Sequence, residues 1–160
     1  CHGNLLMTDT LLTTVEIEPT GAARSSVIWM HGLGADAHDF EPIVPELNLP
    51  AQLGIRFVFP NAPIRPVTVN GGMRMRAWYD VFSTDLPRRE DPDGVYESER
   101  AIVALLEREK QRGVPAERIV LAGFSQGGAM ALHTGLRYPN RLAGILALSC
   151  YLPLASQLNS

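Results

Sequence analysis

Short runs that are apolar along nearly their whole length constrain the fold of this 160-residue chain more than any other feature. A strand of this kind must be covered on both faces, as in a parallel sheet between helices. Segments with helical spacing of apolar residues separate these runs. We therefore predict an α/β fold with a mostly parallel sheet flanked by helices. The expected strands are 11–17, 27–30, 55–59, 118–121 and 142–148, and the expected helices are 36–47, 94–112 and 126–138. Within 36–47, Pro42 and Pro45 restrict where the regular part of the helix can lie.

The segment 61–93 interrupts this alternation with prolines and the sequence Asn70-Gly71-Gly72. The apolar residues of 67–69 and 73–75 flank that sequence, which predicts a small hairpin. An irregular stretch of this length is uncommon in a compact domain and is usually functional. We therefore expect it to contribute to a site.

Composition excludes several classes of protein. The chain is 46% hydrophobic, with 14 Lys+Arg against 17 Asp+Glu, so disorder and nucleic-acid or anionic-membrane binding are not expected. It contains no apolar run near the roughly 20 residues that span a bilayer. The cysteines, Cys1 and Cys150, form no disulfide framework, which favours a reducing, cytoplasmic compartment. The four histidines are scattered and no CxxC occurs, so we expect neither a metal nor another cofactor.

The segment Gly123-Phe124-Ser125-Gln126-Gly127 matches G-x-S-x-G, the nucleophile elbow. An apolar run precedes it and a helix of small and apolar residues follows, as a strand–turn–helix elbow requires. Glycines at these positions leave room for the adjoining strand and helix. Ser125 is therefore the predicted nucleophile, and the structural alternative is a glycine-rich turn with an idle serine.

A second motif, His31-Gly32-Leu33-Gly34, follows the run 27–30 directly. Acyl transfer needs two backbone N–H donors for the developing oxyanion, one from the residue after the nucleophile and one from such a loop. The same region, 32–37, also fits the dinucleotide fingerprint G-x-G-x-x-A. That fingerprint requires an acidic residue at the end of the next strand, where 57–61 has none. The oxyanion interpretation is therefore favoured.

Four segments in this order resemble the phospholipase/carboxylesterase family of α/β-hydrolases, which includes small bacterial carboxylesterases and acyl-protein thioesterases. They are 27–36, 59–63, 77–80 and 121–129. The resemblance runs from about 27 to 152. It implies Ser125 as nucleophile, the N–H groups of Leu33 and Gln126 as the oxyanion hole, and a wall of the acyl pocket formed by the irregular segment from Pro63 to Trp78. Trp78 itself is equally compatible with a place in the core.

The sequence departs from the family in its acid and base, which should follow the nucleophile in chain order. Residues 126–160 contain no Asp or Glu, and their one histidine, His133, lies about 12 Å along the helix from Ser125. His31 and His38 lie in or beside the oxyanion loop, where a structural role is expected. We therefore expect 7–160 to be the N-terminal part of a single α/β-hydrolase domain, preceded at 1–6 by a leader or cloning remnant.

These observations favour a serine esterase that acts on a small-molecule ester or thioester of short-to-medium acyl length. Protein thioesters and lysophospholipids are the next substrates to consider. The missing acid and base keep a second class open, a hydrolase-fold protein that binds without turnover. The last expected strand, 142–148, would present an unpaired apolar edge, which favours association and makes a homodimer possible.

Overall fold

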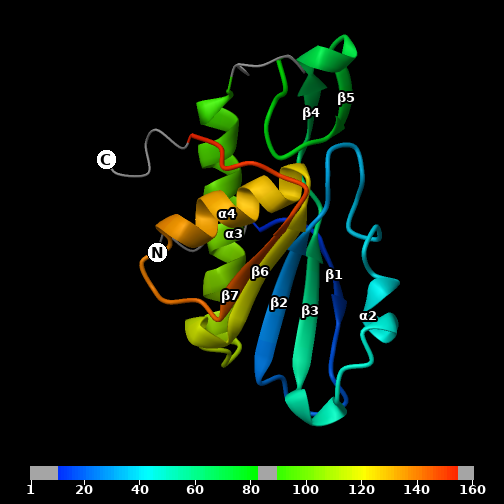
Figure 1. Cartoon of the computed structure of the whole chain (residues 1–160), viewed down its shortest axis with the longest axis vertical. Helices are drawn as coiled ribbons and strands as arrows, with labels where there is room; N and C mark the ends of the chain where they lie inside the picture. The colour runs from blue at the N-terminus through cyan, green and yellow to red at the C-terminus, as the bar shows by residue number, and fades with distance from the viewer. Residues whose placement is uncertain (1–10, 83–89, 155–160) are drawn as a thin grey trace, which may run out of the picture.

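The computed structural model describes residues 11–82 and 90–154, which form a five-stranded sheet with helices on both faces (Figure 1). Four of its strands are parallel and the edge strand β1 is antiparallel, which confirms the predicted mostly parallel sheet. The order across the sheet is β1 (Thr14–Ile17), β3 (Ile55–Pro60), β2 (Ser25–Met30), β6 (Ile119–Phe124) and β7 (Gly144–Leu148).

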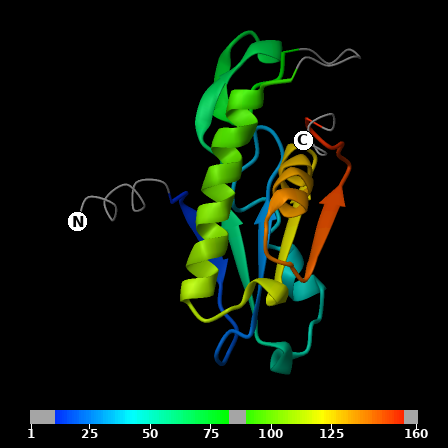
Figure 2. The same ribbon diagram turned by 90° about the vertical axis from the view of Figure 1, so that its left-hand side faces the viewer.

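Alternate residues of the central strands pack into different halves of the core. Ile28 and Met30 join the cluster beneath α3 (Pro92–Gln111) and α4 (Gln126–Arg137), whereas Trp29 joins the cluster on the other face. Figure 2 shows α3 and α4 side by side on the same face of the sheet. The central strand β2 is thus covered on both faces, as predicted, whereas β7 at the edge of the sheet exposes Leu146 and Leu148.

The long helix α3 begins and ends where local sequence signals favour it. The Asp91 side chain accepts a hydrogen bond from the Gly94 N–H, and Pro92 occupies the first turn, where its missing N–H costs nothing. Gly113 follows the helix with a φ of +96°, in the left-handed region that ends helices. The observed bounds agree with the predicted 94–112 to within two residues.

The predicted helix over 36–47 is wrong in extent, since only the single turn α2 (Ile43–Glu46) is helical there. Pro45 has no N–H to donate to a preceding turn, and Asn48 adopts a φ of +48°, so a longer helix does not form. Phe40 and Val44 nevertheless pack on the face of the sheet that carries Trp29. The apolar spacing therefore predicted the buried face of this segment correctly and the length of its helix incorrectly.

The predicted hairpin is present, with strands β4 (Ile64–Val67) and β5 (Met73–Arg76) antiparallel to each other. Its first strand lies three residues earlier than expected. The 3₁₀ turn η2 (Thr68–Asn70) occupies the expected strand position, and two further 3₁₀ turns are η1 (Ala51–Leu53) and η3 (Ala116–Arg118). The hairpin stands above the carboxyl ends of the parallel strands (Figure 1).

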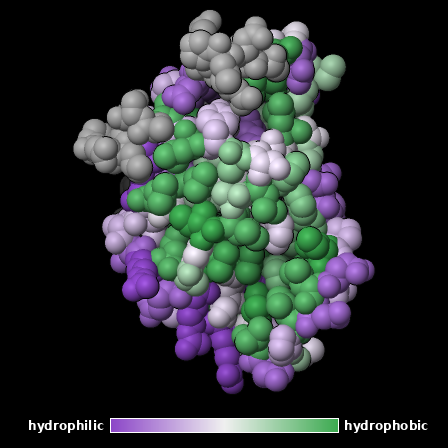
Figure 3. Space-filling view, in the orientation of Figure 1, coloured by the Kyte–Doolittle hydropathy of each residue, from purple (hydrophilic) through white to green (hydrophobic). Residues whose placement is uncertain are grey.

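Within 11–82 and 90–154, no helix is both long enough and apolar enough to cross a membrane. Figure 3, in the orientation of Figure 1, shows a broad hydrophobic area across the middle of the molecule, where β6 and β7 lie. Exposed large apolar side chains on these strands are Phe124, Leu146 and Leu148. The expected leader at 1–6, with Cys1, falls outside the described residues.

Candidate active site

The predicted nucleophile lies on a tight turn between β6 and α4. Ser125 has φ 54° and ψ −118°, a conformation that is strained for a residue with a side chain. Its N–H donates to the Leu148 carbonyl at 2.8 Å, and its carbonyl accepts from the Ala129 N–H at 2.9 Å. These two bonds hold the strained residue, so the predicted strand–turn–helix context of the motif is confirmed.

The glycines of the motif are required by close backbone packing. A Cβ on Gly123 would lie 2.3 Å from the carbonyl carbon of Gly127, and one on Gly128 would lie 2.9 Å from the Gly123 oxygen. Strand and helix thus cross with no room for side chains at these positions. This close packing of Gly123 against the first turn of α4 favours a nucleophile elbow over a generic glycine-rich turn.

A cavity of about 250 Å³ opens beside Ser125. The structure brings the predicted nucleophile, Ser125, and the two residues predicted for the oxyanion hole, Leu33 and Gln126, into the lining of this one cavity. In the described part of the chain, neither the Leu33 N–H nor the Gln126 N–H donates to a backbone carbonyl. The first N–H groups of a helix have no intrahelical acceptor, so that of Gln126 remains available to a ligand oxygen.

The loop that carries Leu33 is held by one backbone bond to β5 and by another within the loop itself. The Gly34 N–H donates to the Arg76 carbonyl at 2.9 Å, which ties the loop to β5, and the Ala35 N–H donates to the Gly32 carbonyl at 3.2 Å. Gly34 adopts a φ of +78°, where glycine is unstrained. The loop therefore presents a defined backbone to the cavity.

His31 supports the same loop from within the core, where it is 2% exposed. Its Nε2 accepts the Ala62 N–H at 3.0 Å, and its Nδ1 lies 2.7 Å from the Gly32 carbonyl. An N–H cannot accept and a carbonyl cannot donate, so the ring is neutral with its proton on Nδ1. Burial lowers the pKa of His31, with Arg76 adding to the effect and Asp36 and Asp39 opposing it. The expected structural role agrees with this geometry.

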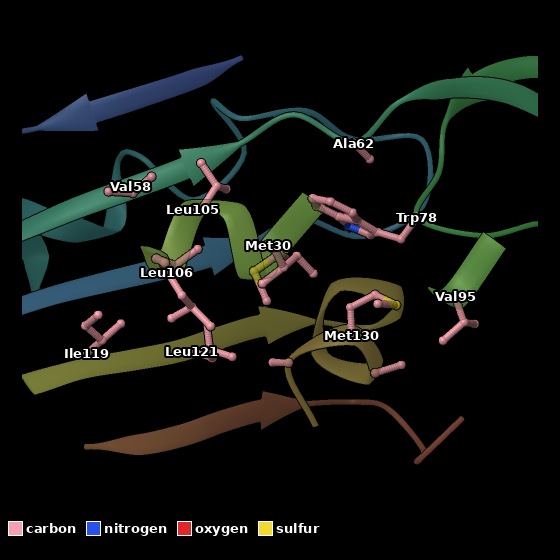
Figure 4. Packing of buried hydrophobic residues seen from close by; sticks show 14 of the residues in the cluster. Met30, Val58, Ala62, Trp78, Val95, Leu105, Leu106, Ile119, Leu121 and Met130 are labelled. Atoms are coloured by element: carbon pink, nitrogen blue, oxygen red, sulfur yellow. The ribbon is translucent and has the colours of Figure 1, made fainter. Parts of the chain in front are cut away.

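Trp78 lies in the core, fully buried (Figure 4), and its ring stands near Met30 and Ala62. The indole N–H donates to the His31 carbonyl at 2.9 Å. Among the described residues that line the cavity, the next residue, Tyr79, is present and Trp78 is not. The expected wall, 63–78, contributes no residue to the described lining of the cavity, where the adjoining residues 79–81 lie instead. The Trp78 side chain occupies the core position that was the alternative.

The other histidines lie away from the nucleophile. His133 is fully buried on α4, with its Nε2 3.3 Å from the Glu99 carboxylate of α3, and desolvation lowers its pKa. His38 is exposed beside Glu41. No histidine lines the cavity among the residues that the structure describes. The exclusion of His133 as the base therefore agrees with its position.

Three carboxylates that sequence reasoning missed also line the cavity, namely Asp80, Glu90 and Asp91. Each accepts a backbone hydrogen bond, from Thr68, Leu154 and Gly94 respectively. They serve to order the cavity wall. The one available signal was Asp80, which belongs to the segment 77–80 that carries the family resemblance. Within the described residues, no group of three or more His, Cys, Asp or Glu side chains is placed to hold a metal ion.

The parallel sheet, the elbow at the end of β6 and the oxyanion loop at the end of β2 define an α/β hydrolase. Residues 13–160 match the model of the phospholipase/carboxylesterase family. The chain belongs to this family.

Relatives of known name support this assignment. Acyl-protein thioesterase 1 of Schizosaccharomyces pombe is 42% identical over 149 residues, which cover 93% of this chain and 66% of the relative. Acyl-protein thioesterase 1 of Neurospora crassa is 43% identical, over 82% of this chain and 56% of the relative. The chain thus spans two thirds or less of the length of these relatives.

Solved structures show the same fold. Acyl-protein thioesterase 2 of Zea mays superposes with a TM-score of 0.77 at 30% identity, covering 91% of this chain and 65% of that one. The Bacillus cereus carboxylesterase has a TM-score of 0.68 at 17% identity, over 96% of this chain and 66% of that one, a likeness of fold alone.

Proposed function

We propose that this chain supplies the nucleophile and the oxyanion hole of a serine hydrolase acting on carboxylic esters and thioesters. The observation that carries the proposal is the convergence of Ser125, Leu33 and Gln126 on one cavity. The Ser125 Oγ attacks the carbonyl carbon, and the two backbone N–H groups stabilise the resulting oxyanion. The bond to the leaving oxygen or sulfur then breaks, and water hydrolyses the acyl-enzyme.

The general base and its acid partner are the two further groups that this chemistry requires. The chain order of the elbow places both after the nucleophile, and residues 126–160 offer no carboxylate side chain and only the buried His133. We propose that they are supplied by residues outside these 160, on the same polypeptide or on another. The Ser125 proton would pass to that base during attack and then to the leaving group.

The size of the cavity favours short-to-medium acyl groups. Its volume of about 250 Å³ lies just below the roughly 300–1,000 Å³ usual for ligand pockets. The names of the fungal relatives favour a second candidate, an S-acylated protein as the thioester. We propose a cytoplasmic location for either activity, in keeping with the low cysteine content.

A binding protein without turnover is the other functional class that an observation favours. No histidine lines the cavity in the described part of the chain, and a serine without a base is a poor nucleophile. Such a protein would hold the same small esters or thioesters and release them unchanged.

Hydrolysis of p-nitrophenyl butyrate, p-nitrophenyl palmitate and an S-acylated peptide distinguishes these possibilities. We expect the full protein to hydrolyse the butyrate fastest and Ser125→Ala to lose at least about 10³-fold in kcat. Ser25→Ala, at the opposite end of β2, is the matched control and should retain activity. Faster hydrolysis of the peptide would favour the thioesterase, and no turnover of any substrate would favour the binding protein.

A further inference from the structure

The side chain of Gln126 makes two hydrogen bonds that the proposed chemistry does not explain by itself. The residue is 5% exposed. Its Oε1 accepts the Trp78 N–H at 2.7 Å, and its Nε2 donates to the Tyr79 carbonyl at 2.8 Å. The amide orientation follows from these partners, because an N–H must face the oxygen and a carbonyl must face the nitrogen. The amide thus pairs with the backbone of 78–79 much as a neighbouring strand would.

The backbone of 78–79, to which this amide is hydrogen-bonded, leads directly into a wall of the cavity. Tyr79, Asp80 and Val81 follow Trp78 directly and all line the cavity. The Trp78 carbonyl accepts a hydrogen bond from Ser98 of α3, and the Trp78 indole N–H donates to the His31 carbonyl. The wall is therefore fastened to α3, to the oxyanion loop and, through Gln126, to the first residue of α4.

Gln126 thus contributes both to the proposed oxyanion hole and to the fixing of the cavity wall. The backbone N–H of Gln126 is a predicted oxyanion donor, and its side chain fixes the wall against which the acyl group would lie. We propose that Gln126 is a positioning residue, whose side-chain amide holds the cavity wall at a fixed position relative to the oxyanion hole. This inference rests on the proposed function.

Loss of this fixed position of the wall should affect the chemical step more than substrate binding. A displacement of about 1 Å between reacting groups costs up to about 10²-fold in rate. The side chains of Tyr79, Asp80 and Val81 would still line the cavity without the amide, so ground-state binding should change little. We therefore expect the kcat of Gln126→Met to fall about 10- to 100-fold, with KM within about two-fold of the wild type.

Replacement by glutamate provides a reversible test of the same contact. In Gln126→Glu, an ionised carboxylate would still accept from the Trp78 N–H but would repel the Tyr79 carbonyl. A protonated carboxyl would donate to that carbonyl, as the glutamine amide does. We expect the kcat of Gln126→Glu, relative to wild type at the same pH, to rise at least about five-fold as the pH falls through the titration of this buried carboxyl.

The experiment measures p-nitrophenyl butyrate hydrolysis by the full protein and its variants across pH. Gln52→Met, on an exposed side chain, controls for the substitution, and Ser26→Ala, which loses a buried hydrogen bond to Glu109, controls for general destabilisation. Both should keep the wild-type kcat at temperatures well below unfolding. If Gln126→Met fails to fold, the pH dependence of Gln126→Glu decides.

The inference is overturned if Gln126→Met keeps kcat within two-fold of wild type, or if the relative kcat of Gln126→Glu does not change with pH. The same assay on Ser125→Ala separates this failure from that of the proposed function. Full activity of Ser125→Ala would refute the nucleophile, whereas an inactive Ser125→Ala beside an unimpaired Gln126→Met would refute the positioning role alone.

Discussion

Gly127 packs directly on the carbonyl oxygen of Met30, at the point where α4 crosses the end of β2. A Cβ on Gly127 would lie 2.3 Å from that oxygen and 2.4 Å from the oxygen of His31. Real side chains do not approach backbone so closely. This contact joins the helix that follows the nucleophile to the loop that carries Leu33, so both halves of the proposed oxyanion hole depend on it.

Replacing Gly127 by alanine should therefore destabilise the protein severely. The Met30 carbonyl belongs to β2 and the His31 carbonyl accepts the Trp78 indole N–H, so neither can shift freely. We therefore expect a loss of about 3 kcal/mol in the free energy of unfolding. Urea unfolding measures it. Gly144→Ala is the matched control, since nothing lies within 4 Å of a Cβ at that glycine. A Gly127→Ala variant as stable as Gly144→Ala would contradict the packing described here.

Stability should fall as the pH falls below about 6.5, because His31 is held neutral in the fold. Its pKa is lower when folded than when unfolded, so in this range the unfolded chain binds more protons. The stabilisation is complete above the unfolded pKa of 6.5 and is lost as the pH falls toward the folded pKa. His133, whose pKa is also lowered, contributes with the same sign.

Urea unfolding of wild type and His31→Gln between about pH 7.5 and pH 5 measures this dependence. The variant should be less stable at neutral pH and should show a shallower slope with pH, with the share of His133 remaining. His38→Gln controls for the loss of a histidine, because that side chain is 70% exposed. An unchanged slope in His31→Gln would mean that His31 is not the group that titrates.

Trp78 should contribute mainly to stability. Trp78→Ala removes a fully buried ring and should cost about 3–5 kcal/mol, whereas Trp78→Phe leaves the His31 carbonyl without its indole donor and should cost about 1–3 kcal/mol. Thermal and urea unfolding test both values. If Trp78→Ala instead kept its stability and raised only KM, the side chain would belong to the acyl pocket and not to the core.

The 160-residue chain should associate through β7. In the described residues this strand pairs only with β6, and it exposes Leu146 and Leu148 on one face, with Leu148 opposite the exposed Phe124. An apolar strand edge of this kind is a template for pairing. Leu146→Glu should reduce association in sedimentation, whereas Leu53→Glu, at a similarly exposed leucine, should not. A monodisperse wild-type monomer that melts cooperatively above about 45 °C would contradict this expectation.

Local patterns in the sequence predicted the strands, the hairpin and the elbow, because each depends on neighbouring residues. The apolar spacing over 36–47 indicated the buried face but not the extent of the helix, which the restriction by Pro42 and Pro45 reduces to the single turn α2. The place of Trp78 depends on His31, which is 47 residues away, and no local pattern encodes such a contact. For the same reason the hydrogen bonds between the Gln126 side chain and the backbone of 78–79 could not be predicted from the sequence.

The identity of the nucleophile is tested most directly by covalent labelling of the full protein with a fluorophosphonate probe, followed by tryptic digestion and mass mapping. The tryptic peptide 119–137 contains Ser125 as its only serine, so the modified residue can be assigned without ambiguity. We predict a single stoichiometric adduct on Ser125, absent from Ser125→Ala. An adduct on any other residue, or labelling that persists in Ser125→Ala, would contradict the proposed site.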